Sequence, residues 1–165
     1  KRPADIASRQ TLGHYEADLM FNIGSQAANI LTIVERKSRK VALVKHESKH
    51  SEPIIESLAK KLGSGAKSCT FDNGKEFAYH QEISRTLKTN FYFAHPYQSW
   101  QRGLNEHTNG LIREYFPKET EFQEITDKQI VEVQNKLNNR PRKVLGYKTP
   151  AEVFFDTITK SYSAA

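Results

Sequence analysis

Three acidic residues occupy positions at which a carboxylate could be catalytic. Asp18 falls in the middle of an apolar, strand-like stretch, Asp72 directly follows another such stretch, and Glu106 projects from the polar side of an expected helix. Each has an ordinary structural explanation when it is taken alone, and the Asp-Asn-Gly sequence that begins at residue 72 is typical of a turn. A carboxylate inside a central strand is nevertheless costly unless something satisfies it.

The three carboxylates predict a reaction only if they converge. If the first and fourth strands are neighbours, Asp18 and Asp72 share a crevice, and a helix packed on the sheet brings Glu106 to it. Converging carboxylates repel one another and need protons or divalent cations, and hard oxygen ligands suit Mg²⁺ or Mn²⁺. Two such ions, roughly 3.5–4 Å apart, clamp the attacking and leaving oxygens of an in-line phosphoryl transfer.

The composition fits a nucleic-acid substrate. The chain has 165 residues, with 25 Lys+Arg against 19 Asp+Glu and a net charge of +6, and its pI of about 9.4 favours polyanionic partners. Its 37% hydrophobic residues suffice for one packed domain. No apolar run approaches the roughly 18 residues of a membrane span. The single cysteine, Cys69, excludes an intramolecular disulfide and a multi-cysteine zinc site, and we interpret it as a buried strand thiol in a reducing compartment.

The hydrophobic pattern predicts an α/β domain with a mixed sheet. Five strand-like stretches are separated by turns or helices, and they span residues 14–22, 28–35, 40–46, 67–71 and 90–94. The first three form an antiparallel meander, and crossovers make the later strands parallel. We therefore expect one five-stranded sheet with helices on both faces.

Five helices are expected between and after these strands. The first starts with Ser51 as its N-cap and stops at Gly63, and the second carries apolar residues at 79, 83 and 87. The third begins near Trp100 and carries Glu106. A capping box of Thr126 with Gln129 begins the fourth, and the same signal at residues 149–152 begins a final short helix.

Several stretches of this sequence resemble the catalytic core of bacterial insertion-sequence-30-type transposases, which belong with the retroviral integrases in the DDE group. The matching stretches are residues 13–19, 35–39, 71–77, 100–118 and 139–143. The resemblance runs from about Gly13 to Phe154, and its most specific part is the segment 100–118. The 33 residues that separate Asp72 from Glu106 also match this family.

The resemblance implies a ribonuclease H-like fold and a metal-binding catalytic triad of Asp18, Asp72 and Glu106. It implies two ions of Mg²⁺ or Mn²⁺ when DNA is bound. In the implied reaction, an activated water nicks the element end, and the freed 3′-hydroxyl then attacks target DNA without a covalent enzyme intermediate.

Basic and amide side chains near the triad are candidates for DNA contact. On the helix of Glu106, we favour Arg102 and Asn109, and Arg113 is an even choice between DNA contact and a solvated face. A basic cluster after the fourth helix suits the phosphate backbone and comprises Arg140, Arg142 and Lys143. A second basic turn consists of Arg36, Lys37, Arg39 and Lys40, for which ordinary solvation is an equal alternative. Gly103 and Gly110 indicate a close approach to that helix, by the sheet or by DNA, and we favour the sheet.

Residues 1–12 are polar and lack periodicity, so we expect them to form an arm or linker, with residues 13–165 as a single catalytic core. The chain opens at Lys1 without an initiator Met, so we expect it to be a fragment of a longer protein. The upstream DNA-binding domain would then be missing. The expected partners are element-end and target DNA in a homodimer or higher oligomer, with no membrane and no small-molecule substrate, in the bacterial cytoplasm at the nucleoid. Two alternatives are a ribonuclease H-like nuclease that never joins strands and a non-catalytic nucleic-acid-binding domain. A third alternative is a structural oligomerisation domain, which would show no salt-dependent DNA affinity.

Overall fold

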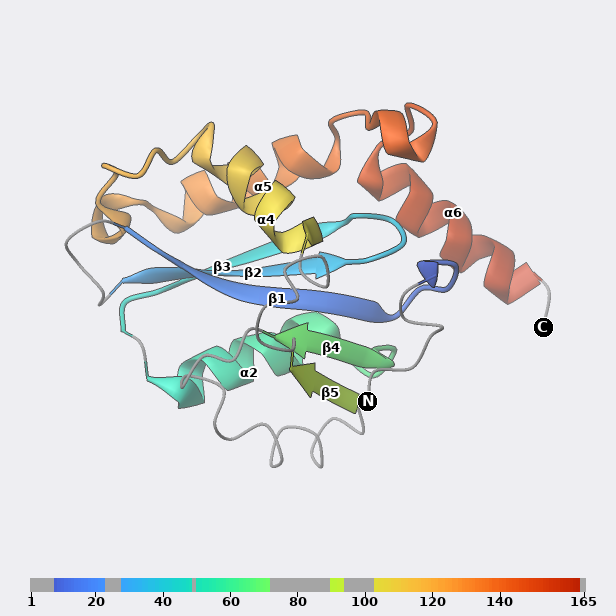
Figure 1. The fold of residues 1–165 in the computed structure, drawn as a ribbon, viewed down its shortest axis with the longest axis horizontal. Coiled ribbons are helices and arrows are strands. Elements are labelled where there is room, and N and C mark those ends of the chain that lie inside the picture. Colours follow the sequence, from blue (N-terminus) through green and yellow to red (C-terminus); the bar gives the residue numbers. More distant parts are fainter. Residues whose placement is uncertain (1–7, 23–27, 49, 72–89, 94–102, 164–165) are drawn as a thin grey trace.

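A five-stranded sheet forms the centre of the molecule, with the strand order β3-β2-β1-β4-β5 (Figure 1). The computed structural model describes residues 8–22, 28–48, 50–71, 90–93 and 103–163. The strands are β1 (His14–Phe21), β2 (Asn29–Glu35), β3 (Val41–His46), β4 (Ser68–Phe71) and β5 (Asn90–Phe93). All five lie within about one or two residues of the stretches expected from the hydrophobic pattern.

The sheet is mixed, and β1 lies where its two halves meet. β1 pairs antiparallel with β2 and parallel with β4, and β3 and β5 extend the two halves in the same sense. The described pairing of β1 with β4 ends at Ala17 opposite Phe71, whereas its pairing with β2 continues to Phe21 opposite Asn29. The end of β4 therefore comes one residue before Asp18 on the neighbouring strand.

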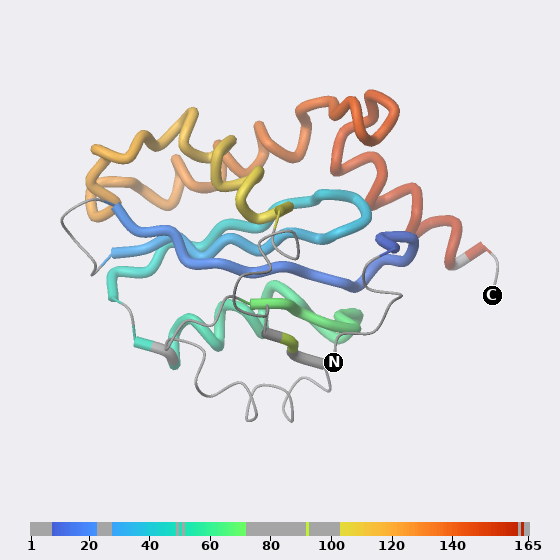
Figure 2. Tube along the Cα trace, viewed as in Figure 1, coloured from blue at the N-terminus to red at the C-terminus, as the bar shows by residue number. Residues whose placement is uncertain are grey.

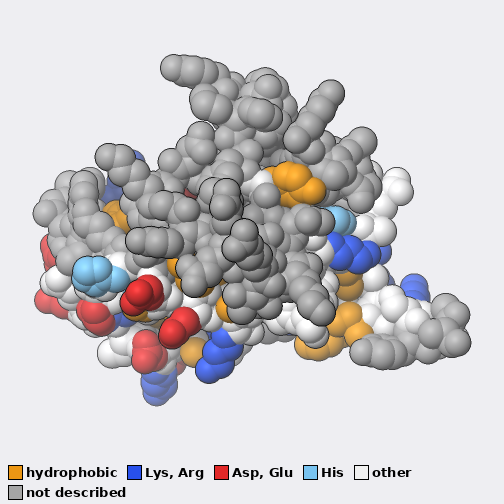
Figure 3. Space-filling model, turned by 90° about the horizontal axis from the view of Figure 1, so that it is seen from below, with side chains coloured by type: hydrophobic (Ala, Val, Ile, Leu, Met, Phe, Trp, Pro, Cys, Tyr) orange, Lys and Arg blue, Asp and Glu red, His pale blue; other side chains and the backbone are white. Residues whose placement is uncertain are grey.

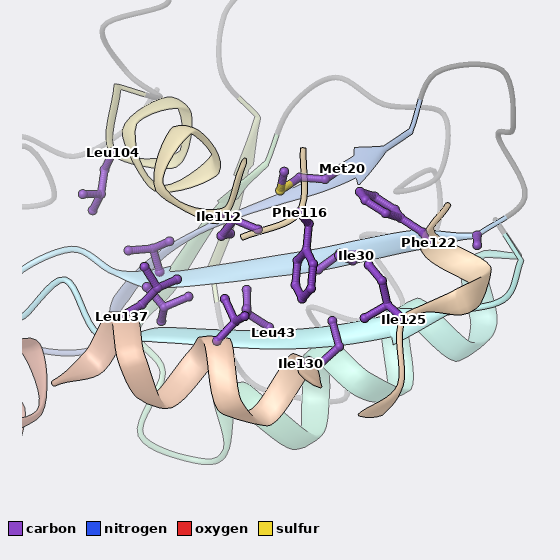
Figure 4. Close-up of a cluster of buried hydrophobic side chains, with 14 residues drawn as sticks. Met20, Ile30, Leu43, Leu104, Ile112, Phe116, Phe122, Ile125, Ile130 and Leu137 are labelled. Atoms are coloured by element: carbon purple, nitrogen blue, oxygen red, sulfur yellow. The ribbon is translucent and has the colours of Figure 1, made fainter. Parts of the chain in front are cut away.

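Helices cover both faces of the sheet (Figures 1 and 2). Below it in the view lies α2 (Ser51–Leu62), and above it lie α4 (Gly103–Arg113) and α5 (Asp127–Asn138). Two apolar cores result, because side chains alternate across a strand. Ala17 contributes to the core beside α2, and Met20 contributes to the core beneath α4 and α5. Figure 4 shows the second core, in which strand side chains meet those of both helices.

Short helical turns and a longer C-terminal helix complete the chain: η3 (Phe122–Glu124), η4 (Lys143–Leu145) and α6 (Pro150–Ser163). α6 has 14 residues, so it is not the short helix that the sequence predicted. It leaves Phe155 57% exposed, and apolar side chains lie near the C-terminal end in Figure 3. None of the helices that the structure describes is long and apolar enough to cross a bilayer.

Two predicted helix starts are confirmed and one is wrong. Thr126 and Gln129 form the full capping box of α5, and Thr149 with Glu152 forms the reciprocal pair of hydrogen bonds at the start of α6. The N-cap of α2 is His50, not Ser51, because residue 50 already has extended backbone and residue 51 is helical. The helix predicted around residues 79–87 lies outside the described residues.

Candidate active site

Asp18 is half-buried on β1, on the face that α4 covers. Its Oδ1 accepts a hydrogen bond from the backbone N–H of Leu19 at 3.0 Å, and its Oδ2 accepts one from Asn109 Nδ2 of α4 at 2.9 Å. The described pairing of β1 with β4 ends at Ala17 opposite Phe71, one residue before Asp18. The partial exposure of Asp18 and these two hydrogen bonds reduce the burial cost that a central-strand carboxylate would otherwise carry.

Glu106 is exposed in the first turn of α4. Asn109 follows it by three residues, and residues at this spacing are neighbours on a helix surface. The contact between Asn109 and Asp18 therefore brings the helix that carries Glu106 against the strand that carries Asp18. Asp72, the third predicted carboxylate, lies outside the described residues, as does Arg102. Within the described ranges, no three His, Cys, Asp or Glu side chains gather closely enough to hold a metal ion.

A second carboxylate on the same face of β1 was not singled out from the sequence. Glu16 is fully buried, forms an ion pair with Arg36 Nη1, and accepts a hydrogen bond from the backbone N–H of Asn105 at 3.2 Å. The charge of Glu16 also helps to raise the pKa of the buried Cys69 thiol, although burial is the larger cause. The signal in the sequence was an acidic residue two positions before Asp18, which places both on one strand face.

This ion pair corrects the interpretation of Arg36. The sequence placed Arg36 in a basic turn that would meet solvent or DNA, but the residue is only 4% exposed. A fully buried Glu16 needs a counter-charge, and the guanidinium supplies it from the neighbouring strand end.

Cationic side chains from separate segments lie near one another beside the start of α4. Burial, Arg9 and Arg142 lower the pKa of Arg39, in that order, and Glu16 opposes them. Burial and then Arg142, Arg39 and Arg140 lower the pKa of His107, which immediately follows Glu106. Arg39 of the first predicted basic turn and Arg140 and Arg142 of the second cluster therefore lie close enough to His107 to lower its pKa. We call Arg9, Arg39, Arg140 and Arg142 the arginine cluster.

Hydrogen bonds fix the segments that carry this cluster. Asn138, at the end of α5, exchanges two 2.8 Å bonds with the backbone of Val41, next to the turn of Arg39. Arg140 pairs with Glu114 at 2.9 Å, and Arg142 donates to the carbonyl of Leu137 at 3.2 Å.

The other predicted contact residues occupy different surroundings. Lys143 is exposed in η4. Arg113 donates through Nη2 to the carbonyl of Phe21 at 2.6 Å, and its guanidinium lies 5.1 Å from the ring centroid of Phe122. These contacts fasten the end of α4 to the end of β1, and contact of Arg113 with DNA stays a prediction.

The glycines of α4 are not explained by sheet packing. Gly103 and Gly110 are exposed, and among the described residues nothing lies within 4 Å of a Cβ placed at either position. The close sheet packing that we favoured for these glycines is therefore wrong within the described residues. A close approach by DNA stays a prediction.

Known proteins similar to this chain include transposases of insertion sequences. The chain is 43% identical over 164 residues to the transposase of IS4351 from Bacteroides fragilis, in a match that covers 98% of this chain and 50% of that protein. It is 42% identical over 157 residues to the transposase InsI of IS30A from Escherichia coli strain K12, covering 93% and 40% of the two chains. The chain thus spans about half the length, or less, of these relatives. No family model matches the chain.

Solved structures of viral integrases share the fold. The catalytic core domain of BIV integrase superposes with a TM-score of 0.72 at 17% identity, covering 91% of this chain and 98% of that one. A chain in the intasome of simian T-cell lymphotropic virus, in complex with a PP2A regulatory subunit, has a TM-score of 0.68 at 21% identity, covering 85% and 53%. The similarity to insertion-sequence transposases, noted from the sequence, is confirmed by the two transposases above, and the fold is similar to that of the BIV integrase catalytic core domain.

Proposed function

We propose that this homologue of insertion-sequence transposases is their catalytic core, which cleaves DNA strands and transfers them in a metal-dependent reaction. The observation that carries the proposal is the contact between Asp18 on β1 and Asn109 on α4, because it brings the helix of Glu106 to the strand of Asp18. Residue 72 directly follows β4, the parallel neighbour of β1. Ligands in open α/β sheets bind at such carboxyl ends of parallel strands. We infer a ribonuclease H-like fold from the strand order and the helices on both faces.

The donor set fits a hard divalent cation. Asp18 is a half-buried carboxylate and Glu106 an exposed one, both on the α4 side of the sheet, and oxygen ligands of this kind suit Mg²⁺ or Mn²⁺. In the proposal, Asp18, Asp72 and Glu106 hold the metal, which when bound supplies Lewis acidity for attack on a phosphodiester. Asn109 keeps the Asp18 carboxylate oriented through its amide.

In the proposal, the arginine cluster binds the DNA phosphate backbone beside this site. Its cations come from residues 8–10, the β2–β3 turn and the segment after α5, and three of them, Arg39, Arg140 and Arg142, act on the charge of His107, the residue next to Glu106. Like charges held together repel one another, and a phosphate backbone removes that repulsion while it releases counterions. Lys143 and Arg102 extend this surface in the proposal, with element-end and target DNA as the partners of a homodimer or larger assembly. In this proposal, residues 13–165 form the core as one domain. The protein acts in the bacterial cytoplasm.

Replacing Asp72 with Asn tests the function. Wild-type protein is expected to nick supercoiled plasmid in Mn²⁺, and Asp72→Asn is expected to lower this activity by at least about 100-fold while it still binds DNA. Lys60→Gln on α2, across the sheet, is the control. If the wild-type protein binds DNA but shows no metal-dependent nicking, a non-catalytic binding domain replaces the proposal.

A joining assay separates the transferase from a nuclease. A labelled duplex with a free 3′-hydroxyl is incubated with plasmid and Mn²⁺, and covalent attachment of the label is measured. Nicking without any attachment would favour the nuclease. An absence of salt-dependent DNA affinity would leave only a structural domain.

A further inference from the structure

Glu16 joins three parts of the fold beneath the proposed catalytic site. Its side chain is fully buried, on the same face of β1 as Asp18. One carboxylate oxygen accepts from the guanidinium of Arg36, at the end of β2. The other accepts from the backbone N–H of Asn105, in the first turn of α4. Early N–H groups of a helix lack partners within the helix, and an acceptor placed there stabilises the helix start.

Two hydrogen bonds with matching spacing tie α4 to β1. Glu16 contacts Asn105, and two residues later on the strand Asp18 contacts Asn109, four residues later on the helix. Two strand residues span about 6.8 Å, and four helical residues rise about 6 Å. The helix therefore runs along the strand in register, in the same direction. Glu106 lies between the two helix residues that make these bonds.

We propose that Glu16 is a positioning residue, whose carboxylate bridges Arg36 to the first turn of α4 and thereby sets the place of Glu106 relative to Asp18. This inference rests on the proposed function only for its effect on catalysis. The bridge itself is a property of the fold. In this proposal Glu16 is not a metal ligand and acts through the helix.

A carboxylate fits this bridge because Arg36 and the backbone N–H of Asn105 are both donors. A guanidinium and a backbone N–H each need an acceptor, and an ionised carboxylate offers an acceptor at both oxygens. Glutamine has nearly the same shape but presents an NH₂ group at one end, which faces a donor whichever way the amide is turned. Glu16→Gln therefore breaks one of the two connections with little change in volume.

Glu35 supplies a matched control. It is 1% exposed, lies at the end of β2, and accepts both bonds from Ser38, at 2.7 and 2.6 Å, through the same oxygen, Oε2. Glu35→Gln is thus a carboxylate-to-amide change at an equally buried site, and the amide oxygen still satisfies Ser38. Both of these bonds stay within the β2–β3 turn, so the change does not act on the start of α4.

The experiment compares amide hydrogen exchange and Mn²⁺-dependent nicking in the wild type, Glu16→Gln and Glu35→Gln. We expect exchange at residues 104–106 to rise at least about tenfold in Glu16→Gln and to stay within about twofold in Glu35→Gln. Nicking should fall by about 10–100-fold in Glu16→Gln, the range typical of residues that orient metal ligands, with DNA affinity unchanged. Leu58→Ala, in the core beside α2, shows the effect of a general loss of stability.

Each outcome decides the proposal. Unchanged exchange at residues 104–106 in Glu16→Gln, or equal losses of nicking in Glu16→Gln and in Leu58→Ala at a matched Tm, would overturn it. If Glu16→Gln does not fold, Glu16→Asp is used, because its shorter side chain keeps the charge near Arg36 but does not span both partners. If wild-type protein never nicks DNA, the proposed function fails, while the exchange result still tests the bridge.

Discussion

Two carboxylates on one face of β1 differ in their access to solvent. Glu16 is fully buried against a guanidinium, whereas Asp18 is half-buried and is held by a neutral amide. A buried charge with a full counter-charge is satisfied and has no affinity left for a cation. The half-buried carboxylate of Asp18 is partly accessible to a ligand, whereas the carboxylate of Glu16 is not. The environment of each side chain, rather than its type, therefore separates the positioning carboxylate from the proposed ligand.

His46 predicts how stability depends on pH. Burial lowers the pKa of its imidazole below 6.5, so the folded protein binds fewer protons at this residue than the unfolded chain does. Its contribution to stability is complete above about pH 6.5 and is lost as the pH falls from there through the lowered folded pKa. We expect the urea midpoint of the wild type to drop as the pH is lowered from about 7.5 to about 5.5.

His46→Gln removes this titration, so its midpoint should change less over the same pH range. His50→Gln, at an exposed histidine, is the matched control and should behave like the wild type. An equal pH dependence in His46→Gln and the wild type would show that other groups govern it.

The β2–β3 turn holds Arg39 in a conformation that favours glycine. Its φ is +63°, and its backbone N–H donates to the carbonyl of Glu35 at 2.8 Å. The left-handed region costs a non-glycine residue roughly 1 kcal/mol or more. Arg39 has this backbone conformation close to Arg9 and Arg142, and we expect its side chain to contact DNA.

Arg39→Gly tests the role of this side chain in DNA binding separately from its effect on stability. The new residue adopts the turn without strain, so the free energy of unfolding should stay within about 1 kcal/mol of the wild type. DNA affinity should fall, and the slope of log K against log salt should become shallower by about 0.9 for each phosphate that the variant no longer neutralises. Fluorescence anisotropy with a labelled duplex at several salt concentrations measures both.

Lys60→Gln removes a charge from the exposed surface of α2 and serves as the comparison. Equal salt slopes in the Arg39 and Lys60 variants would show that net charge alone matters. The arginine cluster would then contribute to DNA binding no more than other surface charges do.

For the whole molecule, local patterns predicted the fold well. Strand boundaries followed from apolar runs and turns, and the starts of α5 and α6 followed from capping residues close in sequence. The buried thiol of Cys69 was likewise confirmed, because its apolar strand predicted it.

What the sequence could not show depends on contacts between distant residues. Arg36 looked like part of a basic turn, because its buried partner, the carboxylate of Glu16, is 20 positions away. The bond from Asn109 to Asp18 spans 91 positions. The convergence of Asp18 and Glu106 was expected from a helix packed on the sheet, but the amide partner of Asp18 follows only from the packing of α4 on β1. Asp72 as the third ligand remains a prediction.

The single cysteine allows the opening rate of the sheet centre to be measured. Cys69 lies fully buried in β4, between β1 and β5, two residues before the end of that strand. Burial raises the pKa of its thiol well above the usual value, and only a thiolate attacks a disulfide reagent. Modification must therefore wait for β4 to separate from its neighbours, so the labelling rate measures local unfolding. Mn²⁺ and DNA together should slow labelling if they bind beside this strand, and labelling as fast as that of a free thiol would show that β4 opens readily.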